Sequence, residues 1–260
     1  MQGMMMNQSL SIIEILRYAA EAHPGGEVVS VRTEGDLHRE SYAEAYLRAA
    51  QLAHGLSGLD IARGDRVATL AWNGHRHFEL YYGVSGMGAV CHTINPRLSA
   101  EQMLYIIHHA GDRVLCFDTT FLPIVEGIAD QLPKGLHLVA MTDRAHMPER
   151  PLNLLCYEEL LDGQDTTFDW PQLPEDTAAA LCYTSGTTGN PKGALYTHRS
   201  TVLHAMGESI ALKNSLTEGA RILPVVPLFH VNAWGLPYAA PLTGASLIMP
   251  GPKLDGASLF

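Results

Sequence analysis

Short, continuous apolar runs alternate with longer segments of helical periodicity along most of the chain. An uninterrupted apolar run rich in β-branched residues is typical of a strand that is buried on both faces of a sheet. We therefore predict strands at residues 66–71, 90–94, 114–117, 136–141, 178–184, 194–196 and 221–226. Helices are predicted at residues 78–88, 121–132, 157–161 and 200–212.

One further helix is marked by a capping signal. Ser99 is followed by Gln102, and a serine and a glutamine at this spacing can each bond the other residue's backbone N–H. Leu104 and Ile107 then form an apolar stripe at helical spacing. The sequence therefore predicts a helix that begins after Ser99.

The alternation of strands with helices predicts the fold class. Consecutive parallel strands need crossover connections, so the pattern favours an α/β fold with layered, largely parallel sheets flanked by helices. Residues 142–177 are rich in proline and scattered charges, and we interpret them as a connecting segment. We place a first α/β subdomain at residues 1–170 and a second, incomplete one at residues 171–260. The chain stops at Leu259 and Phe260 without a polar tail, which indicates a truncated domain.

Composition and charge argue against several classes of protein. A hydrophobic content of 47% with 17% charged residues is that of a globular chain rather than a disordered one. The net charge of −10 argues against a nucleic-acid partner, because such binding needs a basic surface. No apolar run is long enough to span a membrane, and the first residues lack the features of a signal peptide.

The cysteines favour a reducing compartment. They form no CxxC pair, and each lies among apolar residues, which is typical of small buried thiols rather than ligands or nucleophiles. The four residues are Cys91, Cys116, Cys156 and Cys182. We therefore expect a cytoplasmic protein.

Glycines, hydroxyls and a lysine are concentrated in residues 183–193, which read Tyr-Thr-Ser-Gly-Thr-Thr-Gly-Asn-Pro-Lys-Gly. Glycine lets backbone N–H groups approach an anion closely, hydroxyls donate to phosphate oxygens, and Lys192 adds a full positive charge. An ordinary surface turn has similar residues, but it explains neither the lysine nor the apolar strand before the segment. Residues 183–193 therefore predict a phosphate-binding loop.

Two other nucleotide-binding signatures do not fit. In the GxxxxGK[ST] loop the lysine follows a glycine directly, whereas Lys192 follows Pro191 and precedes Gly193. The small residues at 83–88 fail the GxGxxG spacing and lie within a predicted helix, where they favour close helix packing.

Residues 183–193 closely resemble the signature of the adenylate-forming superfamily of acyl-CoA synthetases, luciferases and peptide-synthetase adenylation domains. The similarity continues at residues 196–199, and residues 226–235 (Val-Pro-Leu-Phe-His-Val-Asn-Ala-Trp-Gly) resemble the next motif of this superfamily. The whole chain looks like the N-terminal half of such an enzyme. The second motif is most similar to that of synthetases for medium- or long-chain fatty acids.

The resemblance implies an activity and a set of site residues. Such enzymes join a carboxylic acid to AMP and then transfer the acyl group to a thiol, so the implied ligands are ATP, Mg²⁺, coenzyme A and a carboxylic acid. Lys192 and His230 are the implied catalytic residues, and Thr184 is the implied Mg²⁺ contact. Val231 and Trp234 would bind the acid together with His230. The residues implied to cradle the phosphates are Thr184, Ser185, Gly186, Thr187, Thr188, Gly189 and Lys192.

The same side chains have structural alternatives. His230 can be a hydrogen-bonded structural residue, and Trp234 can be a core aromatic. Tyr81 and Tyr82 lie on a predicted helix and are expected in the core. Further histidines lack the spacing of a metal site and are interpreted as surface or packing residues. They are His75, His77, His108 and His109.

Three functions stay open on the sequence alone. The leading one is a truncated portion of an acyl-CoA synthetase that is inactive by itself. The alternatives are another ATP-binding enzyme, such as a kinase or NTPase, and a non-catalytic binding module. Apolar surface left exposed by truncation would also suit a homodimer.

Overall fold

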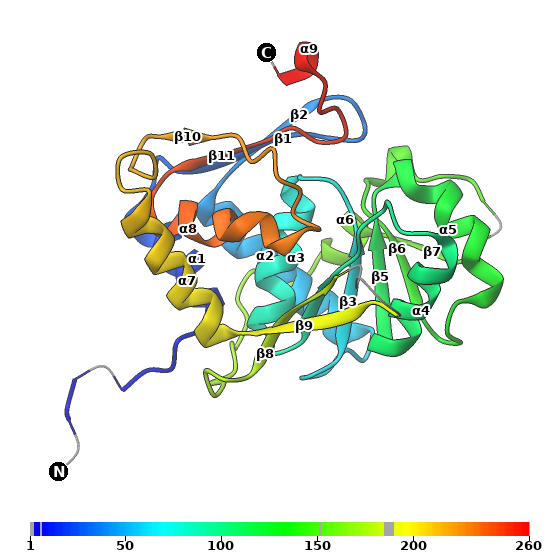
Figure 1. Cartoon of the computed structure of the whole chain (residues 1–260), viewed down its shortest axis with the longest axis horizontal. Coiled ribbons are helices and arrows are strands. Elements are labelled where there is room, and N and C mark those ends of the chain that lie inside the picture. The colour runs from blue at the N-terminus through cyan, green and yellow to red at the C-terminus, as the bar shows by residue number, and fades with distance from the viewer. Residues whose placement is uncertain (1–2, 6, 151, 185–189, 260) are drawn as a thin grey trace.

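The chain forms two β-sheets with helices packed against them (Figure 1). The computed structural model describes residues 3–5, 7–150, 152–184 and 190–259. The larger, seven-stranded sheet has the order β7-β6-β5-β3-β4-β8-β9. The smaller, four-stranded sheet has the order β10-β11-β1-β2.

The bounds of the elements are as follows. The larger sheet consists of β3 (Arg66–Leu70), β4 (Val90–Thr93), β5 (Asp112–Phe117), β6 (His137–Ala140), β7 (Leu154–Cys156), β8 (Ala178–Thr184) and β9 (Lys192–Thr197). The smaller sheet consists of β1 (Glu27–Val31), β2 (Leu37–Ser41), β10 (Arg221–Ile222) and β11 (Ser246–Met249). The α-helices are α1 (Ile12–Ala22), α2 (Tyr42–Gly58), α3 (His75–Gly86), α4 (Ala100–Ala110), α5 (Leu122–Ile128), α6 (Tyr157–Leu161), α7 (His198–Ala211), α8 (Leu236–Thr243) and α9 (Gly256–Leu259).

The predicted α/β class is confirmed. Strands β3 to β8 of the larger sheet pair in parallel, and only β9 runs antiparallel, against β8. The capping box is also confirmed, because the Ser99 hydroxyl accepts from the Gln102 N–H and the Gln102 side chain accepts from the Ser99 N–H, both at 3.2 Å. The four cysteines are buried and unpaired among the described residues.

Some predicted boundaries were wrong. The strand expected at residues 221–226 ends at Ile222, because Pro224 and Pro227 lack the N–H that a continuing strand would donate. The region interpreted as a connecting segment contains an additional strand, β7, at the edge of the larger sheet. The helices and strands before Arg66 were not predicted at all.

Each sheet takes strands from both sides of residue 170. β8 and β9 extend the larger sheet, whose other strands precede residue 170. In the smaller sheet β11 pairs in parallel with β1, so that Val28 lies opposite Leu247. The division into residues 1–170 and 171–260 therefore does not separate the two sheets.

The larger sheet lies between two hydrophobic clusters. Successive strand residues point to opposite faces, so Val67 and Val114 join the cluster formed with α1, α2, α3, α7 and α8. Ala68 and Leu115 join the other cluster, formed with α4 and α5. Figure 1 shows α4 and α5 on one side of this sheet and α2 and α3 on the other.

Helix α3 is buried along its whole length and packs closely on α2. A Cβ atom added at Gly83 would lie 2.8 Å from Leu52 Cδ2 and 3.0 Å from the Ala49 carbonyl oxygen. The glycine therefore permits this close approach, which confirms the packing role expected for the small residues at 83–88. Tyr81 and Tyr82 are fully buried, as predicted.

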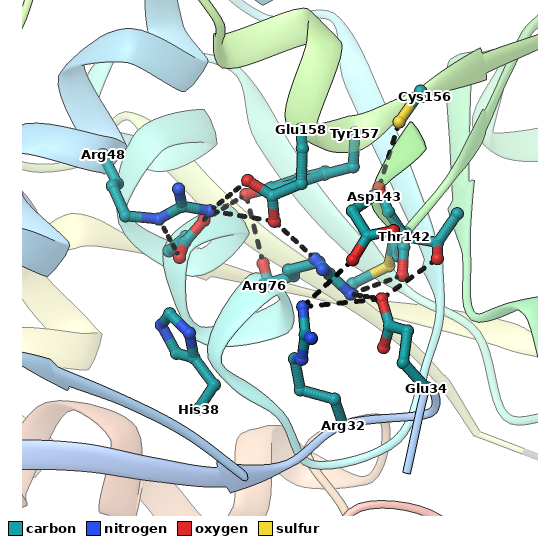
Figure 2. A network of polar contacts seen from close by, with 12 residues as sticks. Arg32, Glu34, His38, Arg48, Arg76, Thr142, Asp143, Cys156, Tyr157 and Glu158 are labelled. Atoms are coloured by element: carbon teal, nitrogen blue, oxygen red, sulfur yellow. Dashed lines mark hydrogen bonds and ion pairs between the residues drawn. The ribbon is translucent and has the colours of Figure 1, made fainter. Parts of the chain in front are cut away.

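Buried ion pairs connect α2, α3, α6 and the turn between β1 and β2 (Figure 2). Arg48 contacts Glu79 at 2.7 Å and Glu158 at 3.0 Å. Arg76 contacts the same Glu158 at 2.7 Å and reaches Glu34 at 2.7 Å. Glu158 thus lies between two arginines, and the network ties the smaller sheet to the helices that cover the larger one.

Among the described residues, no helix combines the length and the apolar character needed to cross a bilayer.

Candidate functional site

The two predicted motifs flank the carboxyl end of β8. This strand lies parallel to β4, and in open parallel sheets ligands bind beyond the carboxyl ends of the strands. In the antiparallel pair with β9, Thr184 lies opposite Lys192. Their side chains are exposed, and the Thr184 hydroxyl donates to the Lys192 carbonyl oxygen at 3.4 Å.

The segment between Thr184 and Lys192 connects the two strands. Ser185, Gly186, Thr187, Thr188 and Gly189 lie outside the described residues, so their roles stay predictions. The hydroxyl of Thr184 and the ammonium of Lys192 lie at the two ends of this connection. A hydroxyl and a cation are the donor types that fit the oxygens of a polyphosphate.

Tyr183 connects the end of strand β8 to helix α4. Its hydroxyl is hydrogen-bonded to Nδ1 of His109 at 2.6 Å, which joins the strand end to α4. Its ring lies 5.2 Å from that of His92, whose Nδ1 lies 2.9 Å from the Asp112 carboxylate. His109 therefore has a packing role, as interpreted from the sequence.

The second motif leads into a left-handed turn, η4 (Val231–Gly235). Val231, Asn232, Ala233 and Trp234 have φ between 42° and 61°, a conformation that costs most L-residues about 1–2 kcal/mol each. Asn232, which tolerates this region, is buried, and its side-chain oxygen lies 3.1 Å from the Tyr81 hydroxyl. Core contacts therefore hold the turn in place.

Two core residues position the backbone that precedes the turn. The Tyr81 hydroxyl donates to the Leu228 carbonyl oxygen at 2.6 Å. Asn73, just beyond β3, accepts from the Leu228 N–H at 2.7 Å and donates to Pro224 O at 2.7 Å and Val226 O at 3.0 Å. Sequence reasoning missed Asn73, although an asparagine at the end of a parallel strand was the available signal.

In the core, the residue just before the first motif contacts the second motif. Cys182 Sγ lies 3.3 Å from the side-chain oxygen of Asn232 and 3.2 Å from the hydroxyl of Thr93. Cys182 shortly precedes Thr184, and Asn232 shortly follows His230. Burial raises the pKa of the Cys182 thiol, so this residue has the structural role expected of it.

A groove of about 770 Å³ lies between α7 and η4 with the start of α8. Val231 and Trp234 both line it, and their role in binding the acid stays a prediction. Trp234 is 66% exposed, so its alternative interpretation as a core aromatic was wrong. His230 is exposed and does not line this groove.

The polar residues of the groove were not predicted. His204 and Glu208 lie on α7, and Tyr238 lies on α8. The Nε2–H of His204 donates to the Trp234 carbonyl oxygen at 2.9 Å, which links α7 to the left-handed turn. The spacing of His204 and Glu208 by one helical turn was the only local signal for them.

In the part of the chain that the structure describes, no group of three or more histidine, cysteine, aspartate or glutamate side chains is placed to hold a metal ion. The role of Thr184 as a Mg²⁺ contact stays a prediction.

Comparison with known proteins places these features in a family. The family described as AMP-binding enzyme matches residues 16–260. The medium-chain-fatty-acid–CoA ligase of Ectopseudomonas oleovorans is 51% identical over 266 residues, which cover 100% of this chain and 48% of that protein. The 3-methylmercaptopropionyl-CoA ligase of Ruegeria lacuscaerulensis is 48% identical over 260 residues, again 100% of this chain and 48% of the relative.

Solved structures agree with the fold. The crystal structure of the anthranilate CoA ligase AuaEII in complex with anthranoyl-AMP superimposes with a TM-score of 0.82 at 24% identity. The match covers 96% of this chain and 46% of that one. The chain thus spans about half the length of the proteins it matches. Because the family profile covers nearly all of its residues, this chain belongs to the AMP-binding enzyme family.

Proposed function

We propose that this chain is the N-terminal part of an ATP-dependent acid–thiol ligase, an acyl-CoA synthetase that acts on a carboxylic acid of the fatty-acid class. The observation that carries the proposal is the contact between Cys182 and Asn232. This contact supports a single site for the two motifs, because Cys182 directly precedes the first motif and Asn232 lies in the turn that follows His230. The names of the two relatives, both CoA ligases of carboxylic acids, support a carboxylic acid and coenzyme A as the substrates.

The proposed reaction has two steps, formation of an acyl-adenylate and transfer of the acyl group to coenzyme A. A carboxylate oxygen of the acid attacks the α-phosphorus of ATP, and the bond from that phosphorus to the bridging oxygen of pyrophosphate breaks. The thiol of coenzyme A then loses its proton to solvent and attacks the acyl carbon of the adenylate, and the bond from that carbon to the phosphate oxygen breaks to release AMP. Two anions must meet in the first step, so positioning and positive charge supply most of the catalysis.

In this proposal each motif residue has the role that the family resemblance implies. Lys192 holds the β- and γ-phosphates with Thr184, Ser185, Gly186, Thr187, Thr188 and Gly189. His230 meets the acid carboxylate beside the α-phosphate, and Val231 and Trp234 guide the acyl chain. Thr184 is the residue that would contact a bound Mg²⁺, and the ion would supply positive charge beside the leaving pyrophosphate.

The 260-residue chain by itself does not complete this reaction, because it spans about half the length of its relatives. We further propose a cytoplasmic location, supported by the unpaired cysteines among the described residues. A homodimer is supported by large apolar side chains exposed on α7 and β9, such as Ile210 at 74% and Leu195 at 59%.

Calorimetry with Mg²⁺-ATP tests the phosphate site. The 260-residue chain is expected to bind ATP, and Lys192→Ala is expected to weaken binding at least about tenfold, because it removes a charged phosphate contact. Lys134→Ala removes an exposed lysine from the other end of the larger sheet and serves as the matched control. Equal affinity of the wild type and Lys192→Ala would contradict the assignment. ATP hydrolysis in the absence of any carboxylic acid would favour a kinase or NTPase instead.

A further inference from the structure

Gly207 lies in the interior of α7, four positions before the last residue of that helix. Glycine inside a helix is less favourable than alanine, because more backbone freedom is lost on folding. The φ angle of Gly207 lies outside the left-handed region, so the backbone conformation does not call for a glycine. Neither helix stability nor backbone conformation therefore explains this residue.

Close packing does not explain Gly207 either. A Cβ atom added at Gly83, in the interior of α3, would lie 2.8 Å from Leu52 Cδ2, so that glycine permits a tight contact. A Cβ atom added at Gly207 would have no side chain and no other segment of the described chain within 4 Å. Gly207 is also exposed. The missing side chain therefore leaves free space rather than a close contact.

This free space belongs to the groove between α7 and η4, which Gly207 lines. Lining residues recur at each turn of α7, so the groove follows one face of the helix. Along this face they are Ser200, His204, Gly207 and Ala211, followed by Leu212 at the end of the helix. From Ser200 to Leu212 a helix rises roughly 18 Å, at about 1.5 Å per residue. The groove is thus elongated along α7, and Gly207 lies near its middle.

The helix contacts the left-handed turn before and after Gly207 in the sequence. The Nε2–H of His204 donates to the Trp234 carbonyl oxygen at 2.9 Å. A Cβ atom added at Gly235 would lie 2.9 Å from Oε2 of Glu208, so the turn approaches α7 closely there as well. The wall formed by η4 includes Trp234, which is 66% exposed. A large apolar surface beside an open helix face fits an apolar ligand.

We propose that Gly207 determines the length of the acyl chain that the groove accepts. This inference rests on the proposed function, because it assumes that the acyl chain occupies this groove. Without a side chain at position 207, an apolar chain can continue past the middle of the groove and bury further methylene groups against its walls. A larger side chain would project into the groove at that point and end the path. The free space at Gly207 therefore favours acids of medium or long chain over short ones.

Calorimetry of the 260-residue chain with hexanoate, octanoate, decanoate and dodecanoate tests this inference. In the wild type, each added methylene group is expected to tighten binding about threefold to fourfold, because the groove has room to bury it. Gly207→Leu places a branched side chain in the middle of the groove. The ratio of the dodecanoate affinity to the hexanoate affinity should then fall at least about tenfold, because about two or more methylene groups lose their place. Gly207→Ala adds a single methyl group and should lower the ratio less.

Gly127→Leu is the matched control for binding. Gly127 is an exposed glycine of α5, which packs on the other face of the larger sheet, and a Cβ atom added there also has no neighbour within 4 Å among the described residues. The same leucine at this position should leave the affinity ratio unchanged.

Gly207→Ala gives a second, independent measurement. It should stabilise the fold and lower the unfolding equilibrium constant about twofold to fivefold, because alanine favours the helix and nothing crowds its methyl group. Chemical denaturation measures this change. A loss of stability in Gly207→Ala would overturn the inference, because it would assign the glycine to packing.

The binding data overturn the inference in three cases. The affinity ratio of Gly207→Leu can equal that of the wild type, hexanoate and dodecanoate can lose affinity to the same extent, or Gly127→Leu can lower the ratio as much. If acids bind the wild type and position 207 does not affect the ratio, the proposed acid site stands and only the inference fails. If no acid binds the wild type, the acid site itself fails and the inference fails with it.

Discussion

The side-chain oxygen of Asn73 accepts a 2.7 Å hydrogen bond from the backbone N–H of Leu228, which lies 155 positions later in the chain. The amide nitrogen of the same side chain donates to two further carbonyl groups of that segment, at Pro224 and Val226. One amide beyond the end of β3 therefore fixes the path of the backbone into the motif that contains His230.

Replacement of Asn73 by alanine should destabilise the fold strongly. The substitution leaves one N–H and two carbonyl groups without their partner, and each buried group of this kind costs about 1–3 kcal/mol. We expect the free energy of unfolding to fall by about 3 kcal/mol in chemical denaturation. Asn153→Ala, at an exposed position, should change it by less than about 0.5 kcal/mol. A loss below about 1 kcal/mol for Asn73→Ala would show that water replaces the amide.

Replacing one arginine of the ion pairs in Figure 2 by alanine should lower the free energy of unfolding far more than the same change in an exposed pair. Arg48→Ala leaves Glu79, which is fully buried, without its cation at 2.7 Å. Removal of one partner of a buried pair costs about 3–5 kcal/mol. The Arg39 side chain makes a 2.8 Å pair with Glu27 but is 60% exposed, so Arg39→Ala should cost at most about 1 kcal/mol. Urea denaturation of both variants measures the contrast, and equal losses would refute it.

Asp118 should make stability depend on pH. Burial raises the pKa of Asp118 to about 7, and the hydrogen bond from the Trp72 N–H at 2.7 Å opposes this shift only in part. The unfolded pKa is about 3.9, so the folded state binds the extra proton between the two values. The contribution of this group to stability is therefore complete below pH 4 and is lost as pH rises through about 7.

Asp118→Asn removes this titration and keeps an oxygen that can accept from Trp72. Relative to the wild type, the variant should gain roughly 2–3 kcal/mol of unfolding free energy between pH 5 and pH 8. Denaturation curves at both pH values measure the gain. Asp130→Asn, which removes an exposed carboxylate, controls for the change in net charge. A difference between variant and wild type that does not vary with pH would contradict the assignment.

Gly251 should not tolerate a side chain. Its φ is +65°, and an added Cβ atom would lie 2.3 Å from the backbone carbonyl oxygen of Val31. Backbone atoms cannot rotate away, so Gly251→Ala should lower the unfolding free energy by about 3 kcal/mol or more. Gly219 has a similar φ of +78° with no atom near the added Cβ, so Gly219→Ala should cost only about 1 kcal/mol. Similar losses for the two variants would mean that the chain at Val31 moves aside.

Local elements were predictable because their causes are local. The boundaries of α6, at Tyr157–Leu161, and the capping box at Ser99 follow from side chains a few positions apart. The runs that follow Arg66 in β3 and that form β8 identify buried strands because no charged residue interrupts them. The phosphate-loop prediction at residues 183–193 likewise depends on donors that lie next to one another in the chain.

The left-handed turn at Val231–Gly235 could not be predicted in this way. Valine, alanine and tryptophan disfavour positive φ, so intrinsic preferences oppose the conformation that these residues adopt. Contacts from Tyr81, Cys182 and His204, all distant in the sequence, hold the turn and open the groove beside it.

The sequence by itself determined the α/β class, the phosphate-loop motif and the family resemblance, since each depends on the order of neighbouring residues. The tertiary structure decided which strands share a sheet, that β1 pairs with β11, and that Val231 and Trp234 line a groove beside α7. The physical reason is that packing and hydrogen bonding depend on distance in space. Residues more than a hundred positions apart leave no periodic signal that shows they will meet.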